Sequence, residues 1–256
     1  MISILITNYN KEKFLRRNIE LLYKSSFKNF EIIIFDDVSS DNSLKTIKHF
    51  KKIKIIKNKK KKFFSPALNQ IYGTVECYKK SKGKLICLLD SDDFFKKNKL
   101  SEIKKFFDKN SKLNCLYNFP VAKKNKFYFK IKDKKNIWPS IFPTSCISLR
   151  KKVMRKFIFF AKVYEFPNLE IDARLNIFMK FYYNEYNYIE KKLTIYNDDQ
   201  FGITSKIPKF SKHWWFRRIE AYNYMQYIFK KKNKTFIRTI DYLITKIISK
   251  TYKIFE

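Results

Sequence analysis

Carboxylates crowd together in the segment Asp90-Ser91-Asp92-Asp93, which directly follows the apolar run Leu85–Leu89. Three carboxylates within four residues repel one another in a confined site, and a divalent cation between them relieves that repulsion. Oxygen ligands at this density suit Mg²⁺ or Mn²⁺, ions that usually carry substrate phosphates. A solvated acidic turn, with Asp93 near the start of the next helix, is the plainer alternative.

Two further polar segments follow apolar runs in the same way. The segment Asp36 to Asp41 (DDVSSD) comes after Ile32–Phe35, and Thr7 to Asn10 (TNYN) comes after Ile2–Ile6. In an open α/β sheet, ligands bind beyond the carboxyl ends of the strands. We expect Asp41 to cap the helix that begins next, and Asp37 to point toward the crevice. The hydroxyl, amide and phenol of the TNYN segment could line a pocket for a nucleotide base.

A parallel sheet is needed to bring these segments together. The apolar runs have the length and continuity of parallel strands buried on both faces, and 53–56 adds a further strand. Segments with a helical pattern alternate with these apolar runs. In the first of them Leu15, Ile19 and Leu22 have helical spacing, and residues 44–50 and 67–80 also have a helical pattern. This alternation predicts an α/β fold with a doubly wound, mostly parallel sheet flanked by helices.

The pattern changes from residue 113 onward. We expect strands at 113–119, 127–131 and 146–149, an extended segment at 188–196 and a helix at 169–181. The stretch 138–144 contains two prolines and is expected to be a loop. The last segment has two apolar stripes at helical spacing, with basic residues around them. They predict two basic amphipathic helices, hinged near Asn233, as a C-terminal helical extension.

Composition limits the class of protein. The 256 residues suit one domain, or one domain with an appendage. The net charge is 57 − 23 = +34, but 45% of the residues are hydrophobic, which excludes a wholly disordered basic chain. The cysteines have neither zinc-site nor disulfide spacing, so we expect buried thiols in a reducing compartment. No apolar stretch reaches the roughly 18 residues of a membrane-spanning helix, and a cytoplasmic location is expected.

Taken together, the polar segments resemble the motifs of the family 2 glycosyltransferases, which have the GT-A fold. That family has a strand followed by T-x-Y-N, here Thr7 to Asn10, and then a strand ending in D-D-x-S-x-D, here Asp36 to Asp41. A glycine before the next strand, here Gly83, and then D-x-D, here Asp90 to Asp92, complete the order. The motifs agree in order and spacing over residues 1 to about 110.

The resemblance implies a sugar transferase that uses a nucleotide-diphosphate sugar, with roles for several residues. It assigns Asp37 to a contact with the nucleotide base, since a carboxylate can accept a hydrogen bond from a uracil N–H. Thr7 and Tyr9 would line the same pocket. Asp90 would contact the ribose. Asp92 would bind Mn²⁺ or Mg²⁺, and Asp93 could assist it.

The resemblance also implies a catalytic base in the second half of the chain. Inverting members carry E-D-x-D-x-x-L, which Glu170, Asp172 and Leu175 match in part, while Leu169 replaces the first Glu. Asp172 is our first choice for the base and Glu170 the second; stabilisation of a helix N-terminus is the alternative for both. His213 and Arg217 could contact the diphosphate or the metal, although such a patch is more often an ordinary polar stripe of a helix.

The family resemblance gives a domain division and a set of partners. Residues 1–205 would form the GT-A catalytic domain, with a nucleotide-sugar half (1–110) and an acceptor half (111–205), followed by the basic helical extension 206–256. A saccharide or lipid-linked saccharide would be the acceptor, in cell-surface polysaccharide or lipopolysaccharide synthesis. The extension could dock on an anionic membrane, on the inner face of the cell membrane.

Two other classes of function remain open from the sequence. A basic protein rich in aromatic residues could bind nucleic acid, but acidic strand ends would repel phosphate, so no nucleic-acid partner is expected. A catalytically inactive, glycosyltransferase-like scaffold is the other reading, against which the intact Asp90, Asp92 and Asp172 argue.

Overall fold

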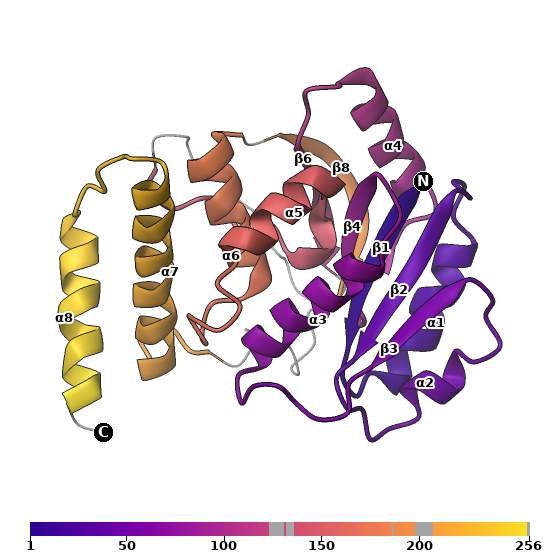
Figure 1. The fold of residues 1–256 in the computed structure, drawn as a ribbon, viewed down its shortest axis with the longest axis horizontal. Helices are drawn as coiled ribbons and strands as arrows, with labels where there is room; N and C mark the ends of the chain where they lie inside the picture. Colours follow the sequence, from indigo (N-terminus) through magenta and orange to yellow (C-terminus); the bar gives the residue numbers. More distant parts are fainter. Residues whose placement is uncertain (123–130, 132–135, 186, 198–206, 255–256) are drawn as a thin grey trace.

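The computed structural model describes residues 1–122, 131, 136–185, 187–197 and 207–254. Its centre is one eight-stranded sheet with the strand order β3-β2-β1-β4-β7-β6-β8-β5 (Figure 1). The strands are β1 (Ile2–Asn8), β2 (Phe30–Asp36), β3 (Ile53–Lys57), β4 (Leu85–Asp90), β5 (Phe94–Phe95), β6 (Cys115–Ala122), β7 (Ile147–Arg150) and β8 (Tyr188–Tyr196).

Parallel pairing aligns the carboxyl ends of three strands that carry the polar motifs. β1 lies between β2 and β4 and is parallel to both, and its Thr7 is the register partner of Phe35 on one side and Asp90 on the other. β3 extends the parallel set beyond β2. The polar residues that follow β1, β2 and β4 therefore meet at one edge of the sheet.

Antiparallel pairs occur in the other half of the sheet. β7 is antiparallel to β4 and β6, and β5 is antiparallel to β8, while β6 and β8 are parallel. Four of the seven pairings are thus parallel. This mixed sheet, flanked by helices, has the mostly parallel α/β architecture expected from the sequence, and that prediction is confirmed.

Helices cover both faces of the sheet. They are α1 (Glu12–Tyr23), α2 (Ser43–Thr46), α3 (Pro66–Lys80), α4 (Lys99–Lys109), α5 (Lys151–Phe160), α6 (Ile171–Phe178), α7 (Lys212–Lys231) and α8 (Ile240–Ile254), together with a 3₁₀ turn η1 (Thr144–Cys146) and a π-helical turn η2 (Met179–Tyr183).

Side chains that point alternately to the two faces of the sheet form two hydrophobic cores. Ile4 and Ile6 of β1 pack with α1 and α4, whereas Leu5 joins the core formed with α3, α5, α6 and α7. Because successive strand side chains point to opposite faces, a strand covered on both sides needs apolar residues at nearly every position. This explains the continuous apolar runs in the sequence.

Most of the elements expected from the sequence are found, with shifted ends. β8 spans the expected 188–196, and β6 and β7 begin two and one residues later than expected, at Cys115 and Ile147. The helix α5 and the short strand β5 were not predicted, and α4 was expected only as the helix that follows the acidic segment. The strand expected at 127–131 falls on residues outside the described part, except for residue 131, which belongs to no helix or strand.

The cysteines are buried and free, as expected: Cys77, Cys87, Cys115 and Cys146. Burial raises the pKa of the Cys115 and Cys146 thiols to about 12. These cysteines are therefore packed as small apolar side chains, and they have no thiolate character near neutral pH.

Two helices end the described chain, as the sequence predicted. Ala221, Met225 and Ile228 of α7 are buried in the same core as α5 and α6, and α8 packs beside α7. The break between α7 and α8 contains Asn233, which has a left-handed backbone (φ 52°). In the described residues, no helix is both long and apolar enough to cross a membrane.

Gly83 offers a test of how tightly β4 is joined to β1. An added Cβ would lie 2.6 Å from both the backbone N and the Oγ of Ser3, and the Gly83 N–H already donates to that Oγ at 2.8 Å. Since backbone atoms cannot move aside cheaply, we expect Gly83→Ala to lower the free energy of unfolding by about 1–3 kcal/mol. Urea denaturation measures this.

The exposed neighbour provides the control for that test. Lys82 has a solvent-exposed side chain, so Lys82→Ala should change the midpoint by little. Equal midpoints for the glycine variant and the wild type would contradict the packing argument.

Candidate active site

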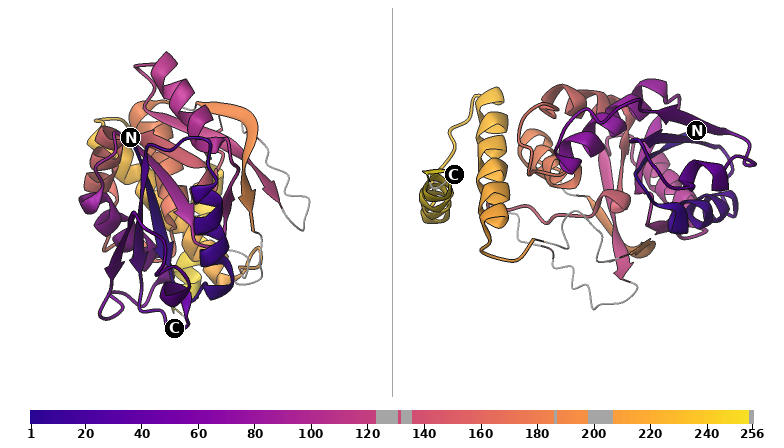
Figure 2. Two further views of the ribbon diagram at one scale, coloured as in Figure 1. Left: turned by 90° about the vertical axis from the view of Figure 1, so that its right-hand side faces the viewer. Right: turned by 90° about the horizontal axis from the view of Figure 1, so that it is seen from below.

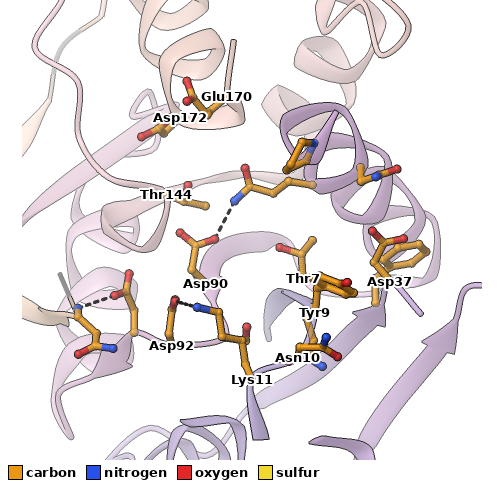
Figure 3. A pocket seen from close by; sticks show the side chains of 18 of the residues that line it. Thr7, Tyr9, Asn10, Lys11, Asp37, Asp90, Asp92, Thr144, Glu170 and Asp172 are labelled. Carbon is orange, nitrogen blue, oxygen red and sulfur yellow. Dashed lines mark hydrogen bonds and ion pairs between the residues drawn. The ribbon is translucent and has the colours of Figure 1, made fainter. Parts of the chain in front are cut away.

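A cavity of about 470 Å³ opens where the carboxyl ends of β1, β2 and β4 meet. Eight of the ten sequence-predicted site residues line it: Thr7, Tyr9, Asp37, Asp90, Asp92, Asp93, Glu170 and Asp172. Figure 3 shows the last two on the far side of Asp90 from the residues of the first two motifs. The fold thus joins motifs from both halves of the chain in one site.

Asp36 and Asp37 are adjacent in sequence but have different surroundings. Asp36 is buried and accepts hydrogen bonds from Asn8 Nδ2 (2.8 Å) and from the Ser39 N–H (3.1 Å), so it holds the turn after β2 to the end of β1. Asp37 lines the cavity, where Asn58 Nδ2 donates to its Oδ1 at 2.8 Å. The backbone of this turn therefore fixes Asp37 at the cavity wall.

Tyr9 lies on the same wall and is covered by a cation. The Lys61 Nζ sits 3.4 Å from the centre of the Tyr9 ring, and both residues line the cavity. An aromatic face next to Asp37 and Thr7 can stack on a planar base (Figure 3). Groups of this kind, an aromatic ring, a carboxylate and a hydroxyl, are able to bind a planar heterocycle.

Asp90 lies at the centre of the cavity. Gln70 of α3 donates from Nε2 to Asp90 Oδ1 at 2.9 Å, and the Asp90 N–H donates to Ser145 Oγ at 2.9 Å. Burial, followed by repulsion from Asp93 and Asp92, raises the pKa of Asp90 well above its usual range. A bound cation or a hydrogen-bond donor from a ligand would stabilise its charged form.

Asp92 and Asp93 turn in different directions. Asp92 Oδ2 is 2.5 Å from Lys11 Nζ, so the first residue after the TNYN motif pairs with the second Asp of D-x-D (Figure 3). Asp93 is 1% exposed, and its Oδ1 accepts a 2.8 Å hydrogen bond from the Asn197 N–H. Burial and the Asp92 charge raise the pKa of Asp93 to about 7.

Glu170 and Asp172 are brought to the cavity by the start of α6. Glu170 is the N-cap residue, Asp172 is in the first turn, and the Ala173 N–H donates to Asp172 Oδ1 at 2.7 Å. A helix N-terminus favours negative charge. Burial nevertheless raises the pKa of both carboxyls, that of Glu170 to about 7, while Arg217 opposes the shift.

Arg217 and His213 lie apart from the cavity lining. Arg217 Nε donates to Glu170 Oε2 at 2.6 Å, so this arginine holds the second candidate base in an ion pair. His213 is exposed on α7. The diphosphate or metal contact expected of these two residues stays a prediction, but Arg217 acts on the site electrostatically through Glu170.

The residues fit a divalent cation that is also bound by a substrate phosphate. Within the part of the chain that the structure describes, no three His, Cys, Asp or Glu side chains form a metal cluster. Mg²⁺ and Mn²⁺ commonly take one or two protein carboxylates and complete their shell with phosphate and water. Asp92, in the cavity beside Asp90, meets that requirement.

Sequence reasoning missed several residues of the cavity, among them Lys11, Lys61, Gln70 and Thr144. Lys11 directly follows the TNYN motif, and this position alone would have placed it at the strand end. Gln70 falls on the buried side of a helix, a pattern that does not distinguish a core residue from a site residue. Lys61 stands in a run of lysines, and no periodic pattern separates it from its neighbours.

Comparison with known proteins agrees with this geometry. The sequence matches the family described as Glycosyl transferase family 2 over residues 3–244. Similar curated proteins include an uncharacterised glycosyltransferase of Rickettsia bellii, 32% identical over 58% of this chain and 21% of that protein. Another is the UDP-Glc:alpha-D-GlcNAc-diphosphoundecaprenol beta-1,3-glucosyltransferase WfgD of Escherichia coli, 32% identical over 39% of this chain and 40% of that protein.

Solved structures have the same fold at low sequence identity. TarS of S. aureus in complex with UDP has a TM-score of 0.64 at 16% identity, covering 88% of this chain and 65% of that chain. The mannosyltransferase PcManGT of Pyrobaculum calidifontis, in complex with GDP-Man and Mn²⁺, has a TM-score of 0.56 at 13% identity, covering 96% and 68%.

The fold, the cavity and the match over nearly the whole chain lead to one conclusion. The mixed sheet is of the GT-A type, and the chain belongs to glycosyl transferase family 2.

Proposed function

We propose that this glycosyltransferase moves a sugar from a UDP-linked donor to an acceptor hydroxyl with inversion at the anomeric carbon. One observation carries the proposal: Asp172, about 80 residues after the D-x-D motif, lines the same cavity as Asp37, Asp90 and Asp92. The proposed nucleotide site and the candidate base would thus share one cavity. The cavity volume of about 470 Å³ is in the range of small-molecule sites.

The donor is proposed from the chemistry of one end of the cavity. Asp37 can accept a hydrogen bond from the N–H of uracil, and the Tyr9 ring can stack on the base. TarS, which has the same fold, was crystallised with UDP and with UDP-GlcNAc, and WfgD is named as a UDP-Glc transferase. These relatives support a uridine nucleotide and leave the sugar open.

Mn²⁺ or Mg²⁺ is the proposed cofactor, held by Asp92, with Asp93 as the second carboxylate that could assist. When bound, the ion would neutralise charge on the diphosphate leaving group. Lys11 Nζ, 2.5 Å from Asp92, is a second positive charge that can approach a donor phosphate. Asp90 is proposed to accept from the ribose hydroxyls.

Asp172 is the proposed general base. It is half-buried and lines the cavity, whereas Glu170 is 5% exposed and occupied by the ion pair with Arg217. Asp172 would take the proton of the acceptor hydroxyl as that oxygen attacks the anomeric carbon. The donor C–O bond breaks, and the nucleoside diphosphate leaves with the electron pair. No covalent intermediate is needed.

The acceptor is proposed to be a saccharide or a lipid-linked saccharide of cell-surface polysaccharide or lipopolysaccharide synthesis. Support comes from the name of WfgD, which includes a diphosphoundecaprenol-linked acceptor. The alignments span only 21% and 40% of the length of the two curated relatives described above. The acceptor therefore rests on analogy, because acceptor sites vary on one fold.

A screen of nucleotide-sugar hydrolysis, with and without Mn²⁺, tests the proposal as a whole. Turnover of one UDP-sugar that depends on the metal is the expected result. An inactive scaffold would bind a nucleotide without turning over any donor. A nucleic-acid-binding protein would show affinity for nucleic acid with a steep salt dependence, and no effect of a sugar nucleotide.

Asp92→Asn tests the metal role. Removing the carboxylate charge should abolish metal-dependent UDP binding in calorimetry, because one protein ligand to the cation is weakened. Asp108→Asn, at an exposed carboxylate of α4 that pairs with Lys104, is the matched control and should bind like the wild type. UDP binding that persists unchanged in EDTA would rule out the metal.

Asp172→Asn tests the base. The amide cannot accept the hydroxyl proton, so transfer should fall by roughly 10²-fold or more, while calorimetric donor binding stays within a few-fold. Glu170→Gln should reduce transfer less. If Glu170→Gln abolishes transfer and Asp172→Asn does not, the base is Glu170.

The pH profile of transfer tests the Arg217 ion pair. A base must be deprotonated to work, and burial raises the pKa of Glu170 to about 7 and that of Asp172 in the same direction. The rate should therefore fall as the pH drops, with an acidic limb above the ordinary pH range of a carboxyl group. Arg217→Gln removes the positive charge that lowers both pKa values, so the acidic limb should move to higher pH.

Arg218→Gln is the control for that measurement, because Arg218 pairs with Asp241 instead. Its profile should match the wild type. Identical acidic limbs in the Arg217 variant and the wild type would show that these carboxyls do not control the rate.

A further inference from the structure

The helix α8 has its polar and apolar sides reversed with respect to the protein. The residues that face α7 are Tyr242, Thr245 and Ser249, which are buried. Ser249 Oγ donates to the Trp215 carbonyl at 3.1 Å, and Arg218 Nε donates to Thr245 Oγ1 at 3.2 Å. A surface helix ordinarily buries its apolar stripe and exposes its polar side. On α8 the side that faces α7 is held by these two hydrogen bonds and by the ring of Tyr242, which packs 5.2 Å from that of Tyr222.

The opposite side of α8 is a stripe of exposed aliphatic residues. Ile240 is 77% exposed and Ile247 is 66% exposed, and the stripe also includes Leu243, Ile244 and Ile254. At 3.6 residues per turn these positions fall on one side of the helix. Figure 1 shows α8 as the outermost helix, separated from the sheet by α7, and the right-hand view of Figure 2 shows the pair at the end of the molecule far from the N-terminal strands.

Positive charge borders this stripe. Lys246, Lys250 and Lys253 are exposed, and helical spacing sets them between the stripe and the side that faces α7. Residues 233–256 contain five Lys or Arg and two Asp or Glu, a net charge of 5 − 2 = +3. Lys230, Lys231 and Lys232 are also exposed, at the C-terminal end of α7.

We propose that α8 lies in the surface of an anionic lipid bilayer, with the aliphatic stripe in the acyl boundary and the lysines at the headgroups. A contiguous exposed apolar patch marks an interaction site, and an apolar stripe flanked by lysines matches an anionic lipid surface. A second copy of the chain fits less well, because a symmetric contact would duplicate the same positive charge on both sides. This proposal goes beyond sugar transfer and does not depend on it.

Sedimentation of the full chain with vesicles tests the proposal. The protein should bind phosphatidylcholine vesicles that contain phosphatidylglycerol far more than pure phosphatidylcholine, and binding should weaken with added salt. Ile247→Ser should reduce the partition coefficient roughly tenfold. Phe159→Ser changes a similarly exposed apolar residue of α5 (72% exposed) and should have little effect.

Variants that remove lysine charges test whether the basic residues of α8 bind the anionic headgroups. Lys246→Gln with Lys250→Gln should lower the partition coefficient by about 25-fold, at roughly fivefold for each basic residue. The same change at the exposed Lys105 and Lys109 of α4 should leave docking nearly unchanged. Equal losses for both pairs would show a non-specific effect of net charge and would overturn the assignment to α8.

Two other outcomes would also overturn the proposal. One is a protein that stays in the supernatant with anionic vesicles at low salt. The other is a dimer, measured by light scattering without lipid, that Ile247→Ser dissociates. Nucleotide-sugar hydrolysis in solution should be the same for Ile247→Ser and the wild type, so a failure of docking is distinct from a failure of the proposed catalysis.

Discussion

Repulsion among carboxylates in one cavity is the constraint on which this structure depends. Five carboxyl groups line the same space: those of Asp90, Asp92, Asp93, Glu170 and Asp172. Because like charges repel, each carboxyl that is ionised raises the free-energy cost of ionising the next one. The pKa of Asp93 and that of Glu170 rise to about 7 as a result of burial and these neighbours. Such a cluster persists when positive groups and hydrogen-bond donors surround it.

The positive groups come from separate parts of the chain. Lys11, after β1, pairs with Asp92, and Arg217, on α7, pairs with Glu170. Lys99 of α4 is fully buried, and its Nζ donates to Thr194 Oγ1 (2.7 Å) and to the Ser145 carbonyl. Burial lowers the pKa of Lys99 to about 8. Each cation also joins distant elements, so the charge balance of the cavity helps to hold the fold around it.

The two ends of the molecule use polar and apolar residues in opposite ways. Around the sheet, apolar residues such as Leu5 and Ile6 fill cores on both faces, and the polar residues that follow β1, β2 and β4 gather at the ends of these strands. At α8, polar residues such as Thr245 make the contact with the protein, and aliphatic residues such as Ile247 face outward. A catalytic body and a lipid-facing helix would require this difference.

The sequence by itself determined the parallel strands and the polar segments at their ends. Continuous apolar runs followed by Thr7, Asp37 or Asp90 are local patterns, and the physical rule that strand ends meet at one edge holds without coordinates. The family resemblance likewise rested on local motifs. It also directed attention to Glu170 and Asp172, although their segment matches the family pattern only in part.

Only the tertiary structure decided which side chains share a space and which are already paired. Three contacts depend on side chains that approach each other across the fold. Lys11 neutralises Asp92, Gln70 donates to Asp90, and Arg217 pairs with Glu170 without lining the cavity. The orientation of α8 was decided in the same way, since its sequence shows an amphipathic helix without showing which side faces α7. Contacts between residues far apart in the chain leave no local pattern, because burial and pairing depend on neighbours that only the fold supplies.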